Sequence, residues 1–490
     1  MVTLVVGAEC YDIMAMVGKG TFGQVIQGQC RSTGDMVAIK ILKNRDHSGQ
    51  IVKNELRLLQ ALREGNTKDS HIVHFLESFS DTVWTYLVFE LLQQNLFDFQ
   101  KQNNFSPLPV RHIRTITAQV LVALVKLKEL SIVHADLKPE NIMLVDHARY
   151  PFRIKLVDFG SAILLPEACH VQEPYIQTRF YRAPEILLGL PFCEKVDIWS
   201  LGCVMAELHL GWPLYPGNDE YDQVCYICST LGLPRGELLC AAQKTRSFFQ
   251  YVPCSAGTWQ LKPPRKVTAK PMERREHIFS SLDQLAVVNV CPVPDPGQEE
   301  LAERCDLYRM VELVKRMLTW DSHERITPSA ALHHPFISMQ EMKASFEATR
   351  YYQLSQEDLR ASCEDSSTAE IFSSTGAFIP ASQRGIQKAT AQMDGLSLAK
   401  PAGDTGDKHQ QDICQAPSPT CCGSQYCQHN WCPQMEPTDG HLSVLGSPSK
   451  MRQYNHCSGS PVVGGIIEQH LPARCSSSSC AKSLWHSQRH

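Results

Sequence analysis

The sequence contains no apolar run of the roughly 18 residues that a membrane-spanning helix needs. It also has no Lys or Arg before the short apolar run at residues 1–8, and so lacks the charged start of a secretory signal peptide. There is no internal repeat and no basic stripe, and the net charge is −4. We therefore expect no membrane partner and no direct binding of nucleic acid.

Disulfide bonds are not expected, although the chain contains 20 cysteines. Without a secretory signal, these cysteines indicate a reducing compartment and free thiols. We expect a cytoplasmic protein. The nucleus is the alternative location, but the basic pairs Arg265-Lys266 and Arg274-Arg275 are thin support for it.

The C-terminal part of the chain differs in composition from the rest. Residues 363–490 are rich in Ser, Gly, Gln, Thr, Pro, His and Cys and have few periodic apolar positions, which favours disorder. A zinc site is the alternative interpretation of part of this segment, although the spacing of the possible ligands matches no common zinc finger. These ligands are Cys421, Cys422, Cys427, His429 and Cys432. We expect residues 348–490 to form a low-complexity, disordered tail.

The hydrophobic content of 43% permits a sizeable core. Residues 11–91 alternate short strand-like runs with turns and contain one helical segment. From about residue 95 to about 347 the apolar spacing is mainly helical, interrupted by a Pro-rich polar stretch at about 253–300. These patterns predict an α+β domain at 11–347, with a small strand-rich part and a larger helical part that carries a surface insertion.

A helix predicted over residues 51–63 places a carboxylate on its apolar face. At about 100° per residue, Glu55 falls in the arc that contains Leu59 and Leu62. A carboxylate turned toward a core needs a cation. Lys40, at the end of the predicted strand 37–40, is the natural candidate, so we expect an ion pair between Lys40 and Glu55.

A glycine-rich loop precedes that strand. Glycines let backbone amides approach nucleotide phosphates without Cβ clashes. A dinucleotide-binding turn has the same glycine spacing, but it needs a helix directly after the loop, and here the turn-rich segment 31–34 follows. We therefore expect a nucleotide-phosphate loop whose candidate binding residues are Gly18, Lys19, Gly20, Thr21, Phe22, Gly23 and Val25.

Residues 134–141 combine a possible base, a cation and an amide after an apolar run. The stretch reads His134-Ala135-Asp136-Leu137-Lys138-Pro139-Glu140-Asn141. Asp158-Phe159-Gly160 follows 17 positions beyond Asn141, after a short predicted strand at 153–157. Carboxylates such as Asp158 are ligands that Mg²⁺ prefers. A simple polar turn is the alternative interpretation of the stretch, but it does not account for the glycine loop and Asp158.

Together these residues resemble a eukaryotic protein kinase domain, a bilobal fold with an N-lobe at about 11–91 and a C-lobe at about 95–347. Finer features resemble the CMGC group and, within it, the homeodomain-interacting protein kinases. These features are the run from Tyr175 to Glu185, the run from Leu137 to Leu144, and the segment 183–192.

The resemblance implies an ATP- and Mg²⁺-dependent protein serine/threonine kinase. Asp136 would act on the substrate hydroxyl, and Lys138 would offset charge on the transferred phosphoryl group. Lys40, held by Glu55, would contact the α- and β-phosphates. The resemblance assigns three further groups: Mg²⁺ ligands Asn141 and Asp158; an adenine pocket with Ala38, Phe89, Glu90 and Leu92; and structural positions Glu185 (paired with Arg325), Asp197 and His134.

Ala135 departs from the general kinase pattern, in which an arginine precedes the catalytic aspartate and clamps a phosphate on the activation loop. Tyr175 occupies the position of the loop tyrosine that the family autophosphorylates. We predict that phospho-Tyr175 is held by Arg179 and Arg182, which are close to it in sequence. The alternative is that Tyr175 packs as an unmodified aromatic side chain.

The competing function is a kinase-like scaffold that recruits partners through its insertion and tail. Pseudokinases usually lose one of the lysine, base or metal positions, whereas Lys40, Asp136, Asn141 and Asp158 are all present. We therefore expect an active kinase with a monomeric domain. Its partners would be protein substrates, among which transcription regulators are suggested by the resemblance alone.

Overall fold

The structure is a computed structural model, and it describes residues 2–6, 9–19, 23–44, 48–67, 69–168, 176–253, 257–263, 279–290 and 295–362. Within these ranges, no helix is both long and apolar enough to cross a membrane. The eight cysteines that lie in them are all free thiols.

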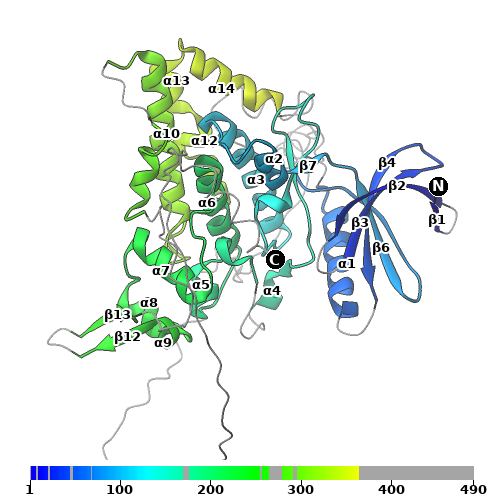
Figure 1. Cartoon of the computed structure of the whole chain (residues 1–490), viewed down its shortest axis with the longest axis horizontal. Helices are drawn as coiled ribbons and strands as arrows, with labels where there is room; N and C mark the ends of the chain where they lie inside the picture. The colour runs from blue at the N-terminus through cyan, green and yellow to red at the C-terminus, as the bar shows by residue number, and fades with distance from the viewer. Residues whose placement is uncertain are drawn as a thin grey trace, which may run out of the picture. The chain divides into compact units, whose positions relative to one another are not determined.

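The N-terminal part of the chain forms one antiparallel sheet of six strands in the order β1-β2-β3-β4-β6-β5. The strands are β1 (Val2–Val6), β2 (Glu9–Lys19), β3 (Gly23–Cys30), β4 (Met36–Lys43), β5 (Phe75–Ser80) and β6 (Trp84–Glu90). One helix, α1 (Ser48–Glu64), lies beside the sheet (Figure 1). This arrangement confirms the strand-rich part with a single helix that the sequence pattern predicts.

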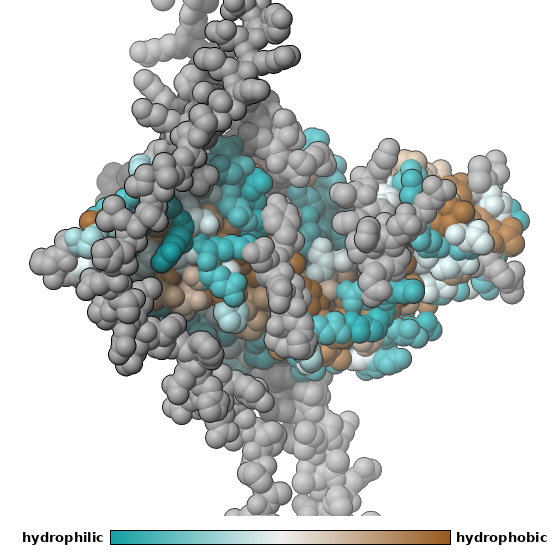
Figure 2. Space-filling model, turned by 90° about the horizontal axis from the view of Figure 1, so that it is seen from below, coloured by the Kyte–Doolittle hydropathy of each residue, from teal (hydrophilic) through white to brown (hydrophobic). Residues whose placement is uncertain are grey.

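The sheet begins earlier than the sequence predicts. β1 pairs with β2 from Val2↔Ile13 to Val6↔Glu9, so the sheet extends to residues before the expected domain start at residue 11. Leu4 packs against the cluster of buried side chains between the strands, which explains why β1 joins the sheet. Apolar surface lies on this part of the molecule (Figure 2), where Val5 and Met16 are among the exposed large apolar residues.

Helices dominate the C-terminal part of the chain. They are α2 (Leu96–Gln102), α3 (Val110–Glu129), α4 (Leu165–Ala168), α5 (Pro184–Leu188), α6 (Lys195–Leu210), α7 (Glu220–Leu231), α8 (Gly236–Ala241), α9 (Thr245–Phe248), α10 (Gln298–Met317), α11 (Pro328–Leu332), α12 (Pro335–Ser338), α13 (Gln340–Phe346) and α14 (Arg350–Ala361). α6 is apolar on most sides, and its residues 196–210 are all buried, so it is the central helix of this part. α3 and α10 both pack against it.

Short strands and 3₁₀ turns position the polar loops between these helices. The strands are β7 (Gln94–Asn95), β8 (Ile132–Val133), β9 (Ile142–Leu144), β10 (Ile154–Leu156), β11 (Ile163–Leu164), β12 (Phe249–Val252) and β13 (Thr258–Leu261). The 3₁₀ turns are η1 (Pro139–Asn141), η2 (Arg179–Tyr181) and η3 (Leu282–Ala286). β9 pairs with β10, and β8 pairs with β11, so both sides of the segment 134–141 are fixed to strands.

Two expectations about the C-terminal part need correction. The stretch 253–300 is not wholly a surface insertion, because Leu282 and Leu285 of η3 are buried and α10 already begins at Gln298. The domain also does not end near 347, because α14 packs on α3 and α10. The first residues of the expected tail therefore belong to the folded domain.

Candidate active site

Lys40 lies between two carboxylates that come from different parts of the chain. Its Nζ is 2.6 Å from Glu55 Oε1 and 2.8 Å from Asp158 Oδ1. Lys40 is on β4, Glu55 is on α1, and Asp158 lies two residues after the end of β10. The ion pair that the helical period of residues 51–63 predicts is therefore present, and it ties α1 to the sheet.

The charges of this group stabilise one another against burial. Burial opposes the charge on Lys40, but Asp158 and Glu55 outweigh it and raise the pKa of Lys40. Burial also raises the pKa of Glu55, with Lys40 acting in the opposite direction. Burial alone would raise the pKa of Asp158, yet the charge of Lys40 lowers that pKa to about 2. Asp158 is therefore ionised and available as an oxygen ligand at neutral pH.

Two glycines, Gly23 of β3 and Gly160 after Asp158, lie where a Cβ atom would make close contacts. A Cβ atom on Gly23 would lie 2.0 Å from the carbonyl oxygen of Ile41, so the close approach of β3 to β4 requires glycine here. A Cβ atom on Gly160 would lie 3.3 Å from Asp158 Oδ1 and 3.4 Å from Glu55 Oε2. Larger residues at these positions would disturb the strand pairing or the carboxylates.

The candidate adenine residues lie on paired strands next to Lys40. Val25 is opposite both Gly18 and Lys40, and Ala38 is opposite Phe89. Phe89 packs at a tilt on Phe75. β6 ends at Glu90, and the chain then crosses to β7, so the sequence-predicted hinge at 90–92 joins the sheet to the helical part (Figure 1). Leu92 is buried.

The segment 134–141 places Asp136 at the centre of a hydrogen-bond network. Lys138 Nζ lies 2.7 Å from Asp136 Oδ2, and Asn141 Nδ2 donates to the Asp136 carbonyl at 2.8 Å. Thr178 donates to Asp136 Oδ1 twice, from its backbone N–H at 3.0 Å and from its hydroxyl at 2.8 Å. The three polar residues that the sequence selected thus meet at one carboxylate.

Sequence reasoning missed Thr178 and its neighbour Gln177. Gln177 has a positive φ of 65°, and its backbone N–H donates to the Ala135 carbonyl at 3.0 Å. No local pattern marks either residue, since their partners lie about 40 positions earlier in the chain. Their only signal is their place inside the run 175–185 that carries the family resemblance.

The backbone of residues 134 and 135 is anchored by Asp197 of α6. Asp197 Oδ2 accepts from the N–H of His134 at 2.8 Å, and Oδ1 accepts from the N–H of Ala135 at 2.9 Å. Burial raises the pKa of Asp197, against these two bonds and the nearby His134. The His134 ring is buried, packs at a tilt on Phe159 and lies 3.0 Å from the Val157 carbonyl. These contacts agree with a structural position for His134.

Glu185 and Arg325 form the buried ion pair that the resemblance implies. Both oxygens of Glu185 accept from the guanidinium group, each at 2.8 Å. Arg325 also donates to the Lys195 carbonyl at 2.8 Å and lies over the Trp199 ring. The pair thus connects α5 to the start of α6 and to the segment before α11.

Arg179 and Arg182 already hold partners within the domain. Arg182 is buried, pairs with Glu220 at 2.9 Å and donates to the Gln177 carbonyl at 2.9 Å. Arg179 donates to the carbonyls of Gly217 and Asn218, and its Nε is buried with no hydrogen-bond partner among the described residues. The contacts of Arg182 are those of a residue that holds the loop backbone in place.

Several sequence predictions lie outside the described residues. These are the loop positions Gly20, Thr21 and Phe22, the side chain of Lys19, Tyr175, the two basic pairs, and the cysteines proposed as zinc ligands.

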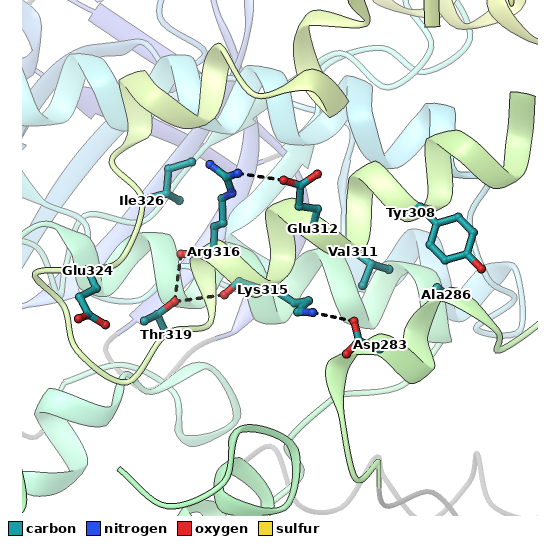
Figure 3. A pocket seen from close by; sticks show the side chains of 10 residues that line it. All are labelled: Asp283, Ala286, Tyr308, Val311, Glu312, Lys315, Arg316, Thr319, Glu324 and Ile326. Atoms are coloured by element: carbon teal, nitrogen blue, oxygen red, sulfur yellow. Dashed lines mark hydrogen bonds and ion pairs between the residues drawn. The ribbon is translucent and has the colours of Figure 1, made fainter. Parts of the chain in front are cut away.

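A separate hollow of about 570 Å³ lies on the helical part, between η3 and α10 (Figure 3). Ala286, Val311 and Ile326 contribute apolar surface to it. Four of its charged side chains form two ion pairs, Lys315 with Asp283 and Arg316 with Glu312. None of the residues that surround Lys40 or Asp136 lines this hollow.

Comparison with known sequences identifies the family. The protein kinase domain pattern matches residues 11–337. The chain is 55% identical to homeodomain-interacting protein kinase 4 of Rattus norvegicus over 435 residues, which are 81% of this chain and 71% of the relative. It is 60% identical to the Homo sapiens protein of the same name over 374 residues, covering 74% of this chain and 61% of that relative.

More distant members of the same group also match. The chain is 49% identical to homeodomain-interacting protein kinase 1 of Mus musculus over 334 residues, which are 67% of this chain and 27% of the relative. The chain thus spans less than two thirds of the human relative and about a quarter of the mouse one. The domain match and these identities place the chain in the protein kinase family, among the homeodomain-interacting protein kinases, and its activity is that of an ATP-using enzyme that acts on proteins.

Proposed function

We propose that this kinase transfers the γ-phosphate of ATP to Ser and Thr hydroxyls of protein substrates, with Mg²⁺. The proposal rests mainly on the two ion pairs of Lys40, whose Nζ lies 2.6 Å from the Glu55 carboxylate and 2.8 Å from the Asp158 carboxylate. Phosphoryl transfer needs positioned cations and a metal-binding carboxylate more than it needs covalent chemistry. This arrangement has both, and it spans the two parts of the domain.

The acceptor side of the reaction would depend on Asp136. Its Oδ1 is bonded to Thr178 and its Oδ2 to Lys138, so the carboxylate is held in one orientation. In this position Asp136 would accept or orient the proton of the substrate hydroxyl. Lys138 would offset charge on the transferred group. A pre-oriented base and cation avoid reorganisation during the reaction.

Mg²⁺ would be held by Asp158 and Asn141, whose residue types fit a hard cation that takes oxygen ligands. The low pKa of Asp158 supports this assignment, because a carboxylate must be ionised to bind the ion. When bound, the ion would neutralise charge between the β- and γ-phosphates. Lys40 would then exchange its contact with Asp158 for the phosphates, while Glu55 keeps it in place.

A preference for proline after the phosphorylated residue is supported by Gln177. Its positive φ turns the backbone, and Arg182 donates to its carbonyl at 2.9 Å. A substrate residue placed beside this carbonyl would find the acceptor already occupied. Proline has no backbone N–H and therefore loses no hydrogen bond there. We expect Ser-Pro and Thr-Pro sites to be preferred.

A kinase assay with Mg-ATP and paired peptides containing Ser-Pro or Ser-Ala tests these assignments. It compares the wild type with Lys40→Ser and Asp136→Asn. The proposal expects phosphate incorporation by the wild type, mainly on the Ser-Pro peptide, and a loss of about 100-fold or more in both variants. Equal, background incorporation by all three proteins would instead favour the scaffold function.

We also propose that Tyr175 is autophosphorylated and that its phosphate is held by an arginine of the loop that follows. Arg179 is the better candidate, because its Nε has no hydrogen-bond partner among the residues that the structure describes, while Arg182 is bound to Glu220. Ala135 supplies no guanidinium group beside Asp136, so a phosphate clamp must come from elsewhere. Mass spectrometry of Tyr175→Phe and Arg179→Ala tests this. Absence of phosphotyrosine in the wild type, with equal activity of all three proteins, would refute it.

For the cellular setting we propose a cytoplasmic monomer that acts on protein substrates, with nuclear residence as the alternative location. The names of the relatives refer to homeodomain proteins as partners. Fluorescence microscopy of the tagged full chain and its mass in solution test location and oligomeric state.

A further inference from the structure

One contact at the start of the hinge is not used by the mechanism above. Both oxygens of Glu90 lie against Lys155 Nζ, at 2.6 and 2.7 Å. Glu90 is the last residue of β6, and Lys155 is the middle residue of β10. The two side chains are 27% and 15% exposed, so this pair is shielded better than an ordinary surface ion pair.

The same carboxylate also binds backbone. Glu90 Oε1 accepts from the N–H of His74 at 2.6 Å, and the N–H of Glu90 donates back to the His74 carbonyl at 3.1 Å. The segment before β5 therefore holds both the main chain and the side chain of Glu90. Residue 90 is fixed from two directions at the point where the chain leaves the sheet.

The segment 71–74 closes the connection to β10. Ile72 forms a parallel bridge with Leu156, in which Leu156 donates to the His71 carbonyl at 2.8 Å and Val73 donates to the Leu156 carbonyl at 3.0 Å. Three chain segments therefore meet: the hinge start, the segment 71–74, and the strand that leads to Asp158. Lys155 is the side chain that joins the first and the third.

We propose that Lys155 is a positioning residue for ATP binding, which fixes Glu90 and thereby the orientation of the hinge backbone at 90–92. The inference rests on the proposed adenine site at that hinge. Lys155 itself would touch neither adenine nor phosphate. Its loss should weaken ATP binding while leaving phosphoryl transfer by the bound complex nearly unchanged, because Lys40 and Asp136 are not altered.

Lys155→Met and the conservative Lys155→Arg, assayed as full chains, test the proposal. We expect KM for ATP to rise about fivefold in Lys155→Met, with kcat within about twofold of wild type. Lys155→Arg should restore KM. Lys128→Met is the matched control, because it removes the 2.8 Å ion pair with Glu194 on the helical part and should leave KM unchanged.

Two further measurements keep the inference separate from folding and from the proposed function. Glu90→Gln keeps an acceptor for the N–H of His74 but loses the negative charge, so it should raise KM for ATP as Lys155→Met does. The double variant with both substitutions should show no further rise in KM. The rise in melting temperature caused by Mg-ADP should be smaller in Lys155→Met than in wild type. An unchanged KM and an unchanged nucleotide shift would overturn the inference, whereas an inactive wild type would instead refute the proposed function.

Discussion

Glu55 is the residue whose placement explains most about the candidate active site. It lies on the apolar face of α1 and is nearly fully buried, which a carboxylate tolerates only with a cation beside it. Its position could be predicted from the sequence, because the 3.6-residue period of α1 places it among leucines. The second partner of Lys40, Asp158, is 118 positions away, and only the family resemblance connected the two in advance.

Glu55→Gln is expected to lower kcat/KM for ATP by about 10- to 100-fold. The neutral amide does not compensate the positive charge of Lys40. Lys40 therefore keeps its ion pair with Asp158 and competes with the metal for this carboxylate. Stability should change little, because burial already raises the pKa of Glu55 and disfavours its charge. Steady-state kinetics and a thermal melt measure both effects. Glu129→Gln, which removes the exposed pair with Lys126, serves as control; equal kinetics in the two variants would contradict the assignment.

His334 gives a prediction about pH. Its Nδ1 caps α12 by accepting from the N–H of Phe336, and its side chain is 1% exposed. Burial lowers the pKa of His334 to about 4, whereas an unfolded histidine titrates near 6.5. Between these values the unfolded state takes up a proton that the folded state does not. The free energy of unfolding should therefore have its full value above about pH 6.5 and should decrease as the pH falls toward 4.

His334→Asn keeps an acceptor for the cap and removes the titration. We expect its melting temperature to fall less steeply than that of wild type between pH 6.5 and 4, by an amount worth about 1 kcal/mol after solvent screening. Parallel curves for wild type and His334→Asn would show that this histidine does not contribute to acid sensitivity.

At the scale of elements, the Glu185–Arg325 pair joins α5 to α6 and to the segment before α11. Arg325→Met should destabilise the domain by about 3 to 5 kcal/mol, because it leaves the Glu185 carboxylate buried without a cation. Glu185→Gln should cost less, since the amide oxygen still accepts from the guanidinium group. Urea unfolding of both variants measures the difference, and the reverse order would contradict this account.

The elements also show where sequence patterns stop being informative. α1, α3 and α6 could be predicted because each repeats apolar residues over three or more turns. β1 could not be, since five residues carry no usable period and only their pairing with β2 makes them a strand. α14 could not be predicted either, since its buried positions are Tyr352, Ser355 and Leu359, of which only the last is strongly apolar.

At the scale of the whole molecule, α14 is the last helix that the structure describes, and it packs on the kinase domain. Tyr351 donates to Asp306 Oδ2 at 2.7 Å, and Asp306 is the buried partner of Arg114 on α3. Arg111 pairs with Asp358 at 2.7 Å. The backbone N–H of Arg350 donates to Glu299 of α10 at 2.8 Å. α14 is therefore tied at both ends to helices of the kinase domain, beyond the family match that ends at residue 337.

These contacts predict different outcomes for two truncations. A chain ending at residue 362 retains every described element and should melt and phosphorylate a peptide as the full chain does. A chain ending at residue 347 loses the Tyr351 hydroxyl that donates to Asp306 and exposes the surface beneath α14, so it should melt at least several degrees lower.

Tyr351→Phe in the longer chain removes this hydroxyl alone and should lower the free energy of unfolding by about 1 to 3 kcal/mol. If the chains ending at 347 and 362 melt together, α14 does not stabilise the domain; if the chain ending at 362 loses activity, the remaining 128 residues take part in catalysis.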